Sequence, residues 1–518
     1  MLTHAQNDGA RRIGRIDIVR QPIFDTTKPA ERNFISSLAN AFHWQTKESI
    51  IRNELLYHEG ETLNPDLIEE SDRNLRALGF IGDIRTQIDT FTDSTARVTV
   101  STHDKWTLAL SPSYQQGGGL QTYSLTAKDD NFLGNAQSMS LGYDYRSDQP
   151  NPHGVEAIFS ERRLFGSRWG MKSQYKNSNL LRVASIYFDR PYYSDETPWA
   201  AGLYADHSDI RIPFFQNSIQ VRENLISEES GNAFYSYSFG DKVKVRPSLA
   251  VVRIRSSGPG LRTFDNVTLL NLSLNVMRRT YSQKTFLDSH GRIEDVPSGF
   301  LAAATCGKNF HPPGTGDPGY FVDCIWQHVP IANESYYLGY SVGAASYLGG
   351  EKPRETTIQW MLQQYAKPDN HQVALVRIQE ISGSDWSMDR QLYLGTQTGL
   401  RGYGEYQFSG QRLLLWNLEY RIFSDADFWI FRPGGAIFFD GGTTWNQGED
   451  LQSQRFHNAV GFGFRVENTK QQGTGTIRLD FAYNLDEHKF AEVIISSSVL
   501  FSAFQQIGFI SPTGAGGF

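Results

Sequence analysis

The segments that decide the fold alternate apolar residues with small or charged ones. Residues 459–466 read Ala-Val-Gly-Phe-Gly-Phe-Arg-Val, and residues 477–484 read Ile-Arg-Leu-Asp-Phe-Ala-Tyr-Asn. Residues 138–145 (Ser-Met-Ser-Leu-Gly-Tyr-Asp-Tyr) and 336–344 (Tyr-Tyr-Leu-Gly-Tyr-Ser-Val-Gly-Ala) repeat the pattern. A period of two residues places alternate side chains on opposite faces of a β-strand. These segments therefore predict strands with one apolar and one polar face.

The same alternation runs from about Trp106 over the remaining part of the chain, roughly 400 residues. A half-buried strand of a soluble protein would alternate in the same way. Three features favour a membrane: the segments reach about ten residues, which a tilted strand needs to cross a bilayer, their polar face is often small or charged, and aromatic residues gather near strand ends as at a bilayer interface. The aromatic residues are Tyr192, Tyr193, Trp199, Trp429 and Phe431.

We therefore expect a mainly β chain in which residues 105–518 form a transmembrane antiparallel β-barrel. Roughly sixteen to twenty segments of this kind can be counted, and we predict about 16 strands, because an even number closes a barrel without exposed edges. The last strand is predicted over residues 489–501.

Composition agrees with a barrel and argues against two other classes. The 518 residues carry a formal net charge of −7, which gives no basic surface for nucleic acid, so we expect no nucleic-acid partner. No segment approaches the roughly 18 consecutive apolar residues of a membrane helix. Residues 1–12 are polar and lack the hydrophobic region of a signal peptide. An exported chain requires one, so either a leader has been removed or the membrane interpretation is wrong.

Residues 13–104 are expected to form a small α+β domain. Thr46 and Asn64 each fit the N-cap of a helix, and Pro65 fits the first helical position after Asn64. The second helix is predicted to end at Gly79. Strands are predicted at residues 13–20, 84–89 and 97–102. The order strand, helix, helix, strand, strand predicts a small sheet with two helices on one face.

This domain resembles a POTRA domain. The resemblance rests on residues 46–56 (Thr-Lys-Glu-Ser-Ile-Ile-Arg-Asn-Glu-Leu-Leu), the break at Gly60 and residues 74–81 (Asn-Leu-Arg-Ala-Leu-Gly-Phe-Ile). Residues 104–107 (Asp-Lys-Trp-Thr) and 131–134 (Asn-Phe-Leu-Gly) are similar to the junction between POTRA domain and barrel in the BamA/TamA superfamily, the bacterial surface antigen type. The resemblance implies a barrel in the bacterial outer membrane with its POTRA domain in the periplasm. The general bacterial insertase carries several POTRA domains, whereas this chain has one.

Two motifs near the C-terminus extend the resemblance. Leu400-Arg401-Gly402-Tyr403 is similar to the superfamily's Val-Arg-Gly-Phe/Tyr loop tip, and Phe438-Phe439-Asp440-Gly441-Gly442 matches its Phe-x-Asp-x-Gly strand. The resemblance implies a loop tip, near residues 399–406, that folds into the lumen.

The physics of such an anchor can be stated from the residue types. Glycines beside Arg401 let the tip approach the barrel wall closely. A lumen-facing carboxylate at Asp440 would accept a bidentate hydrogen bond from the guanidinium group, which lysine cannot reproduce. We expect a structural and gating anchor made of Arg401, Gly402, Tyr403 and Asp440, with Phe438 and Gly442 in the strand motif.

The residue patterns do not support catalysis. Gly339–Gly343 matches Gly-x-Ser-x-Gly, but Ser341 lies in a segment that keeps alternating, whereas a nucleophile elbow needs a sharp strand-to-helix turn. The 12 histidines show no metal-binding spacing and no phosphate-binding loop is present. We predict no enzymatic activity, no catalytic residue, no cofactor and no metal site.

The only two cysteines, Cys306 and Cys324, flank a run rich in glycine and proline. In an oxidising compartment they would close a loop by a disulfide. The alternative is two unrelated thiols.

The resemblance implies a function in outer-membrane protein assembly and insertion, or in protein translocation. An edge of the POTRA sheet would capture an extended client by strand addition, and the seam between the first and last barrel strands would open and pair with a client strand. The alternatives are a dedicated two-partner-type secretion pore for a single client and a structural barrel that does not gate. Expected partners are outer-membrane lipids, unfolded outer-membrane or secreted client proteins, and periplasmic chaperones or accessory lipoproteins.

Overall fold

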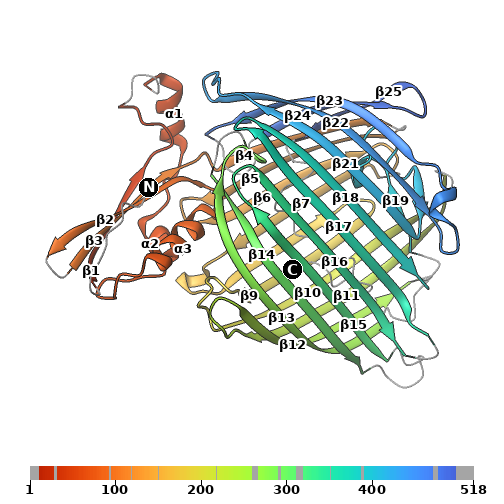
Figure 1. Cartoon of the computed structure of the whole chain (residues 1–518), viewed down its shortest axis with the longest axis horizontal. Helices are drawn as coiled ribbons and strands as arrows, with labels where there is room; N and C mark the ends of the chain where they lie inside the picture. The colour runs from red at the N-terminus through yellow and green to blue at the C-terminus, as the bar shows by residue number, and fades with distance from the viewer. Residues whose placement is uncertain are drawn as a thin grey trace.

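The computed structural model describes residues 11–496, apart from 28–31, 93–94, 118–119, 150, 217–218, 259–265, 290–292, 311–318, 350–351, 387–389 and 471–475. A small α+β domain, red and orange in Figure 1, lies against one mouth of a closed β-barrel. Among the described residues, no helix has the length and apolar character needed to cross a membrane.

The N-terminal domain contains a three-stranded sheet and three helices. Its elements are β1 (Arg12–Gln21), α1 (Phe34–Phe42), α2 (Glu48–Glu54), α3 (Pro65–Arg76), β2 (Ile81–Thr92) and β3 (Thr95–Asp104). The sheet order is β1-β3-β2, with β1 parallel and β2 antiparallel to β3. Helices α2 and α3 enclose a core with the sheet, in which Ile51, Leu75 and Val98 are fully buried. The predicted order of strands and helices is confirmed except for α1, which the sequence pattern did not predict.

Of the two predicted helix N-caps, the one at α3 is confirmed and the one at α2 is wrong. Asn64 is the N-cap of α3, its side chain accepts a hydrogen bond from the Asp66 amide, and Pro65 occupies the first turn. At α2 the N-cap is Lys47 rather than Thr46. The Thr46 hydroxyl instead accepts a hydrogen bond of 2.8 Å from Asn131 Nδ2, at the end of the second barrel strand. A contact between domains has therefore replaced the local cap.

Twenty antiparallel strands form the barrel, in the order β4 to β18 followed by β21 to β25, and β25 pairs with β4 to close it. The first ten are β4 (Leu108–Gly117), β5 (Leu120–Phe132), β6 (Gln137–Arg146), β7 (His153–Glu161), β8 (Gly170–Asn177), β9 (Leu181–Arg190), β10 (Trp199–Gln216), β11 (Ile219–Tyr237), β12 (Lys244–Ser257) and β13 (Asn266–Lys284). The others are β14 (Glu294–Asn309), β15 (Tyr320–Ala332), β16 (Tyr336–Leu348), β17 (Arg354–Asp369), β18 (Gln372–Ser384), β21 (Arg412–Phe423), β22 (Phe431–Trp445), β23 (His457–Asn468), β24 (Thr476–Asn484) and β25 (Lys489–Ser496).

The predicted number of about 16 strands was therefore too small. Strands β10 and β11 have 18 and 19 residues, far more than the roughly ten that cross a bilayer. Beyond that length polar residues stand on both faces, as at Glu228 and Glu229, so the alternation that identifies a strand is lost. The described part of the last strand ends at Ser496, and residues 497–501 of the prediction lie outside the described residues.

The expected disulfide is not formed. Both cysteines are free and exposed on the outer face, Cys306 on β14 and Cys324 on β15. In the register of these strands Cys306 lies opposite Val322, and Cys324 opposite Ala304. The two cysteines are therefore diagonal neighbours, for which a separation of about 7–8 Å is typical, beyond the usual reach of a disulfide. Strands β14 and β15, which flank the loop, are therefore joined by backbone pairing and not by a disulfide.

The N-terminal domain is docked on the barrel through partly buried ion pairs. Arg76 on α3 makes a bidentate contact of 2.8 and 3.0 Å with Asp295 at the start of β14. Arg163, in the turn after β7, makes another of 2.9 and 2.6 Å with Glu54 on α2. Paired guanidinium–carboxylate contacts fix orientation as well as distance. The domain therefore has a defined position on this mouth, called below the POTRA-side mouth.

Candidate functional site at the lumen loop and the barrel seam

The loop between β18 and β21 folds into the barrel. It contains a short hairpin, β19 (Leu392–Leu394) and β20 (Phe408–Gly410), and between them the tip at residues 399–406. Leu394 and Leu400 are fully buried in an apolar cluster with wall residues of β21 and β23. At Gly442 on β22 a Cβ atom would lie 3.1 Å from the Leu394 side chain and 2.6 Å from the Leu414 carbonyl. The glycine lets the hairpin approach the wall closely.

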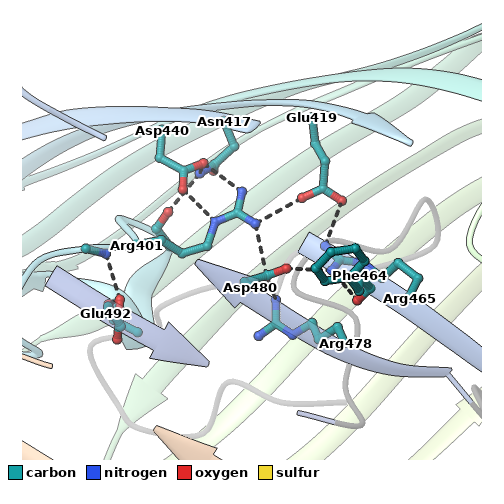
Figure 2. A network of polar contacts seen from close by, with 12 residues as sticks. Arg401, Asn417, Glu419, Asp440, Phe464, Arg465, Arg478, Asp480 and Glu492 are labelled. Carbon is teal, nitrogen blue, oxygen red and sulfur yellow. Dashed lines mark hydrogen bonds and ion pairs between the residues drawn. The ribbon is translucent and has the colours of Figure 1, made fainter. Parts of the chain in front are cut away.

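Arg401 at the tip is fully buried and contacts carboxylates of three strands, as Figure 2 shows. Its Nε and Nη2 donate to Asp440 of β22 at 2.6 and 3.0 Å. Its Nη1 donates to Glu419 of β21 at 3.1 Å and to Asp480 of β24 at 3.3 Å. The Phe438 ring lies 3.4 Å below the guanidinium carbon, a cation–π geometry. The structure thus brings together Arg401, Asp440 and Phe438, which the sequence singled out.

The surrounding charges balance one another. Four guanidinium groups and four carboxylates form one connected set of ion pairs, namely Arg401, Arg421, Arg465 and Arg478 with Asp288, Glu419, Asp440 and Asp480. Burying an unpaired charge is costly, and a balanced, hydrogen-bonded set avoids that cost. Neither Glu419 nor Asp480 was identified from the sequence, although both stand at polar positions of alternating strands.

The ionic set also reaches the POTRA-side mouth. Arg421 on β21 donates from Nη1 to Asp288 at 2.8 Å and to the Leu287 carbonyl at 3.1 Å. Both acceptors belong to the turn between β13 and β14, and Leu287 is buried against lumen-facing side chains. Arg421 also donates to Glu419 at 2.8 Å, and Glu419 in turn accepts from Arg401 of the loop tip. The loop tip, which enters from one mouth, and this turn at the other mouth are therefore linked through Glu419 and Arg421.

Gly402 and Tyr403 attach the tip to the strands beyond the ionic set. Gly402 has φ +85°, and a Cβ atom there would lie 3.3 and 3.5 Å from the methyl groups of Ala482 and Ala459. The Tyr403 hydroxyl donates to the Asn458 carbonyl at 2.8 Å and contacts Asp486 at 3.1 Å, in the turn before β25. Burial raises the pKa of Asp486, but hydrogen bonds from His457 and Tyr403 outweigh it, so the pKa lies below its ordinary value.

Glu492 on β25 ties the same tip to the seam. Its carboxylate is buried and accepts hydrogen bonds from the Gly402 amide at 2.6 Å, from the Thr396 hydroxyl, and from Gln115 Nε2 of β4 at 2.9 Å. Gln397 of the loop donates to Gln115 at 2.6 Å. The lumen loop is therefore hydrogen-bonded to both seam strands. The sequence analysis did not identify Glu492 or Gln115. For Glu492, the only sequence feature that could have suggested a role is a glutamate at a polar position of the last strand.

Strands β25 and β4 form the seam that closes the barrel. Within the described residues they share four register pairs, from Glu492–Gly117 to Ile495–Tyr114. The described part of β25 ends at Ser496, so these pairs give the junction only as far as that residue.

Ser341 lies in the middle of β16, where it pairs with Gln327 and Met361. Its hydroxyl belongs to the buried inner face of a continuous strand. The strand-to-helix turn of a nucleophile elbow is absent at this position.

Comparisons with known proteins bear on the two parts of the chain. Residues 43–103 match the family model of the POTRA domain, described as surface antigen variable number repeat. A comparison with curated protein sequences finds no match.

Three solved structures are similar to nearly the whole chain. BamA from Haemophilus ducreyi lacking POTRA domains 1–3 is 12% identical, with a TM-score of 0.38, over 94% of this chain and 85% of that chain. CdiB from Acinetobacter baumannii is 12% identical, with a TM-score of 0.45, over 94% and 73% of the two chains. CdiB from Escherichia coli is 10% identical, with a TM-score of 0.43, over 96% and 93%.

Within the described residues, the matched POTRA domain is followed by a closed β-barrel.

Proposed function

We propose that this protein assists the insertion of client proteins into the outer membrane, by capturing them at the POTRA sheet and pairing them at the β4–β25 seam. The contacts of the lumen loop with both seam strands carry this proposal, because the loop binds Glu492 on β25 and Gln115 on β4, the two strands that would separate. A client strand that pairs with a freed edge never exposes unpaired backbone groups to lipid.

The POTRA domain offers a first binding edge. Strand β2 pairs with β3 on one side only among the described strands, so its other edge is available for an extended client. Strand addition uses main-chain hydrogen bonds and tolerates varied client sequences. The domain would lie in the periplasm, where clients, chaperones and accessory lipoproteins would meet it.

The lumen loop would set how easily the seam opens. Its tip is hydrogen-bonded to Glu492 on β25 and its Gln397 to Gln115 on β4, so separation of these strands breaks contacts in the lumen as well as the ladder. On the other side Arg401 remains held by β21, β22 and β24. The loop would then act as a latch that stays attached to one side of the seam while the other moves.

A reversible crosslink across the seam tests the proposal. In a background with Cys306→Ser and Cys324→Ser, the pair Tyr114→Cys and Ile495→Cys places cysteines at opposed register positions of β4 and β25. Opposed residues of an antiparallel pair lie about 4.5–5.5 Å apart at Cα, within disulfide range. Oxidation is expected to block client insertion into liposomes, and reduction to restore it.

The control shares one substitution. Tyr114→Cys with Tyr123→Cys crosslinks β4 to β5, a junction inside the wall, and should leave insertion unchanged. Insertion at the uncrosslinked level through an oxidised seam would refute seam opening. If client release into the vesicle interior and ion conductance both persist in the oxidised protein, the chain acts as a secretion pore instead.

A further inference from the structure

Helix α1 lies outside the segment that matches the POTRA family. The residues that match the POTRA family begin at 43, whereas α1 spans Phe34–Phe42, between β1 and α2. Among the side chains that the structure describes, the apolar core of the domain comes mainly from α2, α3 and the sheet and includes none from α1. The helix has its own cap, since the Asn33 side chain accepts a hydrogen bond of 2.8 Å from the Ser36 amide.

One face of α1 is apolar and uncovered. Phe34 is 79% exposed, Leu38 is 43% exposed, and Trp44, just after the helix, is 63% exposed. Phe34, Leu38 and the exposed Ala41 follow the spacing of one helical face, and no charged residue occurs in Phe34–Phe42. Leaving large aromatic side chains in water is unfavourable, so such a face marks an interaction surface.

The opposite face fixes the helix to the barrel rim. Asn40 donates to the Phe24 carbonyl at 2.8 Å and accepts from the Phe24 amide at 3.1 Å. Lys470, in the turn after β23, lies 5.2 Å from the centre of the Phe24 ring, and its carbonyl accepts from the Trp106 amide at 2.8 Å. Trp106 immediately precedes β4. These contacts place α1 near the turn after β23 and the start of β4, and Figure 1 shows it in the N-terminal domain, just outside the POTRA-side mouth.

The turn that contacts Phe24 also contacts a part of the barrel rim that exposes aromatic residues. The amide of Thr469, beside Lys470, donates to the Ile430 carbonyl at 2.9 Å, in the turn between β21 and β22. That turn exposes Phe428 and Trp429, at 71% and 53%. Aromatic residues at this level of a membrane barrel lie at the boundary between lipid headgroups and acyl chains. The same boundary is therefore within reach of α1.

We propose that α1 is an interfacial lipid-binding helix, which inserts Phe34, Leu38 and Trp44 into the membrane leaflet on the POTRA side, beside the seam. Interfacial helices bury an apolar face about 5–10 Å into this boundary. Because the helix has no charge, binding requires only zwitterionic lipid and is insensitive to salt. The inference does not depend on client insertion.

A fluorescent label on the apolar face tests it. The full-length protein, with Cys306→Ser and Cys324→Ser, carries a bimane on Leu38→Cys and is reconstituted in phosphatidylcholine bilayers. Lipids brominated near the headgroup end of the acyl chain are expected to quench this label strongly, and lipids brominated near the chain end less so. The matched control is Gln87→Cys, an exposed position on the free edge strand β2, which should show no quenching.

Two results would overturn the proposal. Quenching at position 38 no greater than at position 87 would mean that α1 does not contact lipid. The second result is a label at position 38 that is not quenched by lipid but changes its emission when an unfolded client is added. This result would show that the apolar face binds clients instead. Phe34→Cys provides a second labelled position on the same face, so the result does not depend on one label that perturbs the helix.

Discussion

The two ends of the lumen loop tip are held in different ways. At one end Arg401 is fully buried and pairs with three carboxylates on β21, β22 and β24, part of one continuous wall in which β23 lies between β22 and β24. At the other end Gly402, Thr396 and Gln397 contact Glu492 on β25 and Gln115 on β4 through hydrogen bonds. The first end has a buried positive charge that pairs with three carboxylates, whereas the donors at the second end are uncharged.

The difference indicates which contacts break first. Breaking a buried ion pair costs several kcal/mol, since the remaining charge stays in a dry environment. A typical hydrogen bond contributes about 0.5–1.5 kcal/mol. A force that strains the loop should therefore detach it from the seam and leave it on the wall. Four predictions follow, in decreasing order of expected effect.

The largest effect is expected at the wall. Arg401→Ala leaves Asp440, Glu419 and Asp480 buried beside one another without their common partner, which should lower stability by about 3–5 kcal/mol. The measurement is the urea midpoint of unfolding in detergent. Arg401→Lys should recover little, because a point charge cannot make the bidentate contact with Asp440.

Arg182→Ala is the control for that change, because its side chain is 61% exposed. An exposed ion pair contributes at most about 1 kcal/mol. Equal midpoints for the Arg401→Ala and Arg182→Ala proteins would show that the buried ionic set does not stabilise the barrel.

A smaller effect is expected at the seam. Glu492→Ala removes the acceptor of the Gly402 amide, the Thr396 hydroxyl and Gln115 Nε2, and unsatisfied buried donors cost about 1–3 kcal/mol. Hydrogen exchange should accelerate in β25 and at residues 399–406 but not in β21 or β22. Glu487→Ala, in the exposed turn before β25, is the control. Unchanged exchange in β25 would contradict the role given to Glu492.

The two hydrogen bonds of Gln115 should matter less. Gln115→Ala removes the bonds from β4 to Glu492 and to Gln397, and we expect a loss of about 1 kcal/mol. Crosslinking between Tyr114→Cys and Ile495→Cys should become slower as the strands separate more often. Gln121→Ala, exposed on β5, is the matched change outside the seam. A rate equal to that control would show that the lumen loop does not tie β4.

The barrel and part of the lumen site could be predicted from the sequence, because two-residue periodicity and helix caps are local patterns along the chain. Alternation located the barrel, and Asn64 with Pro65 located α3. Arg401 and Asp440 were singled out by motif, and the structure places them 2.6 Å apart. A carboxylate such as Glu492, by contrast, resembles any other lumen-facing residue of a strand, because its partners lie 90 and 377 positions away.

Other features escaped for equally physical reasons. The number of strands depends on segments that leave the bilayer, where the two-residue alternation is lost, as in β11. Helix α1 has only nine residues, so its polar positions Ser36, Ser37 and Asn40 give fewer than three turns of helical periodicity. Thr46 has the residue type of an N-cap, but its hydroxyl contacts Asn131, 85 positions away. Local signals fail where a distant partner competes for the same atom.

The smallest expected effect concerns pH, at the contact between the loop tip and the turn before β25. The pKa of Asp486 is lowered in the folded protein, so its contribution to stability is present above its ordinary pKa of about 3.8 and is lost as pH falls through the folded value. The bonds lost on protonation are those from Tyr403, His457 and Arg455. Exchange at residues 399–406 should therefore accelerate below about pH 4, while the bonds of Arg401 to Asp440 persist.

Asp486→Asn separates this contribution from general acid effects. The amide cannot titrate, so the variant should exchange faster at neutral pH and lose the additional acceleration below about pH 4. Asp450→Asn, at an exposed position in the loop between β22 and β23, should keep the normal profile. If the Asp486→Asn protein keeps that profile as well, the acid response arises elsewhere. If the Asp486→Asn protein loses the acid response, protonation of one carboxylate is enough to loosen the loop tip on the side nearest the seam. The ion pairs of Arg401 would still hold the other side, as expected from the difference between the two attachments.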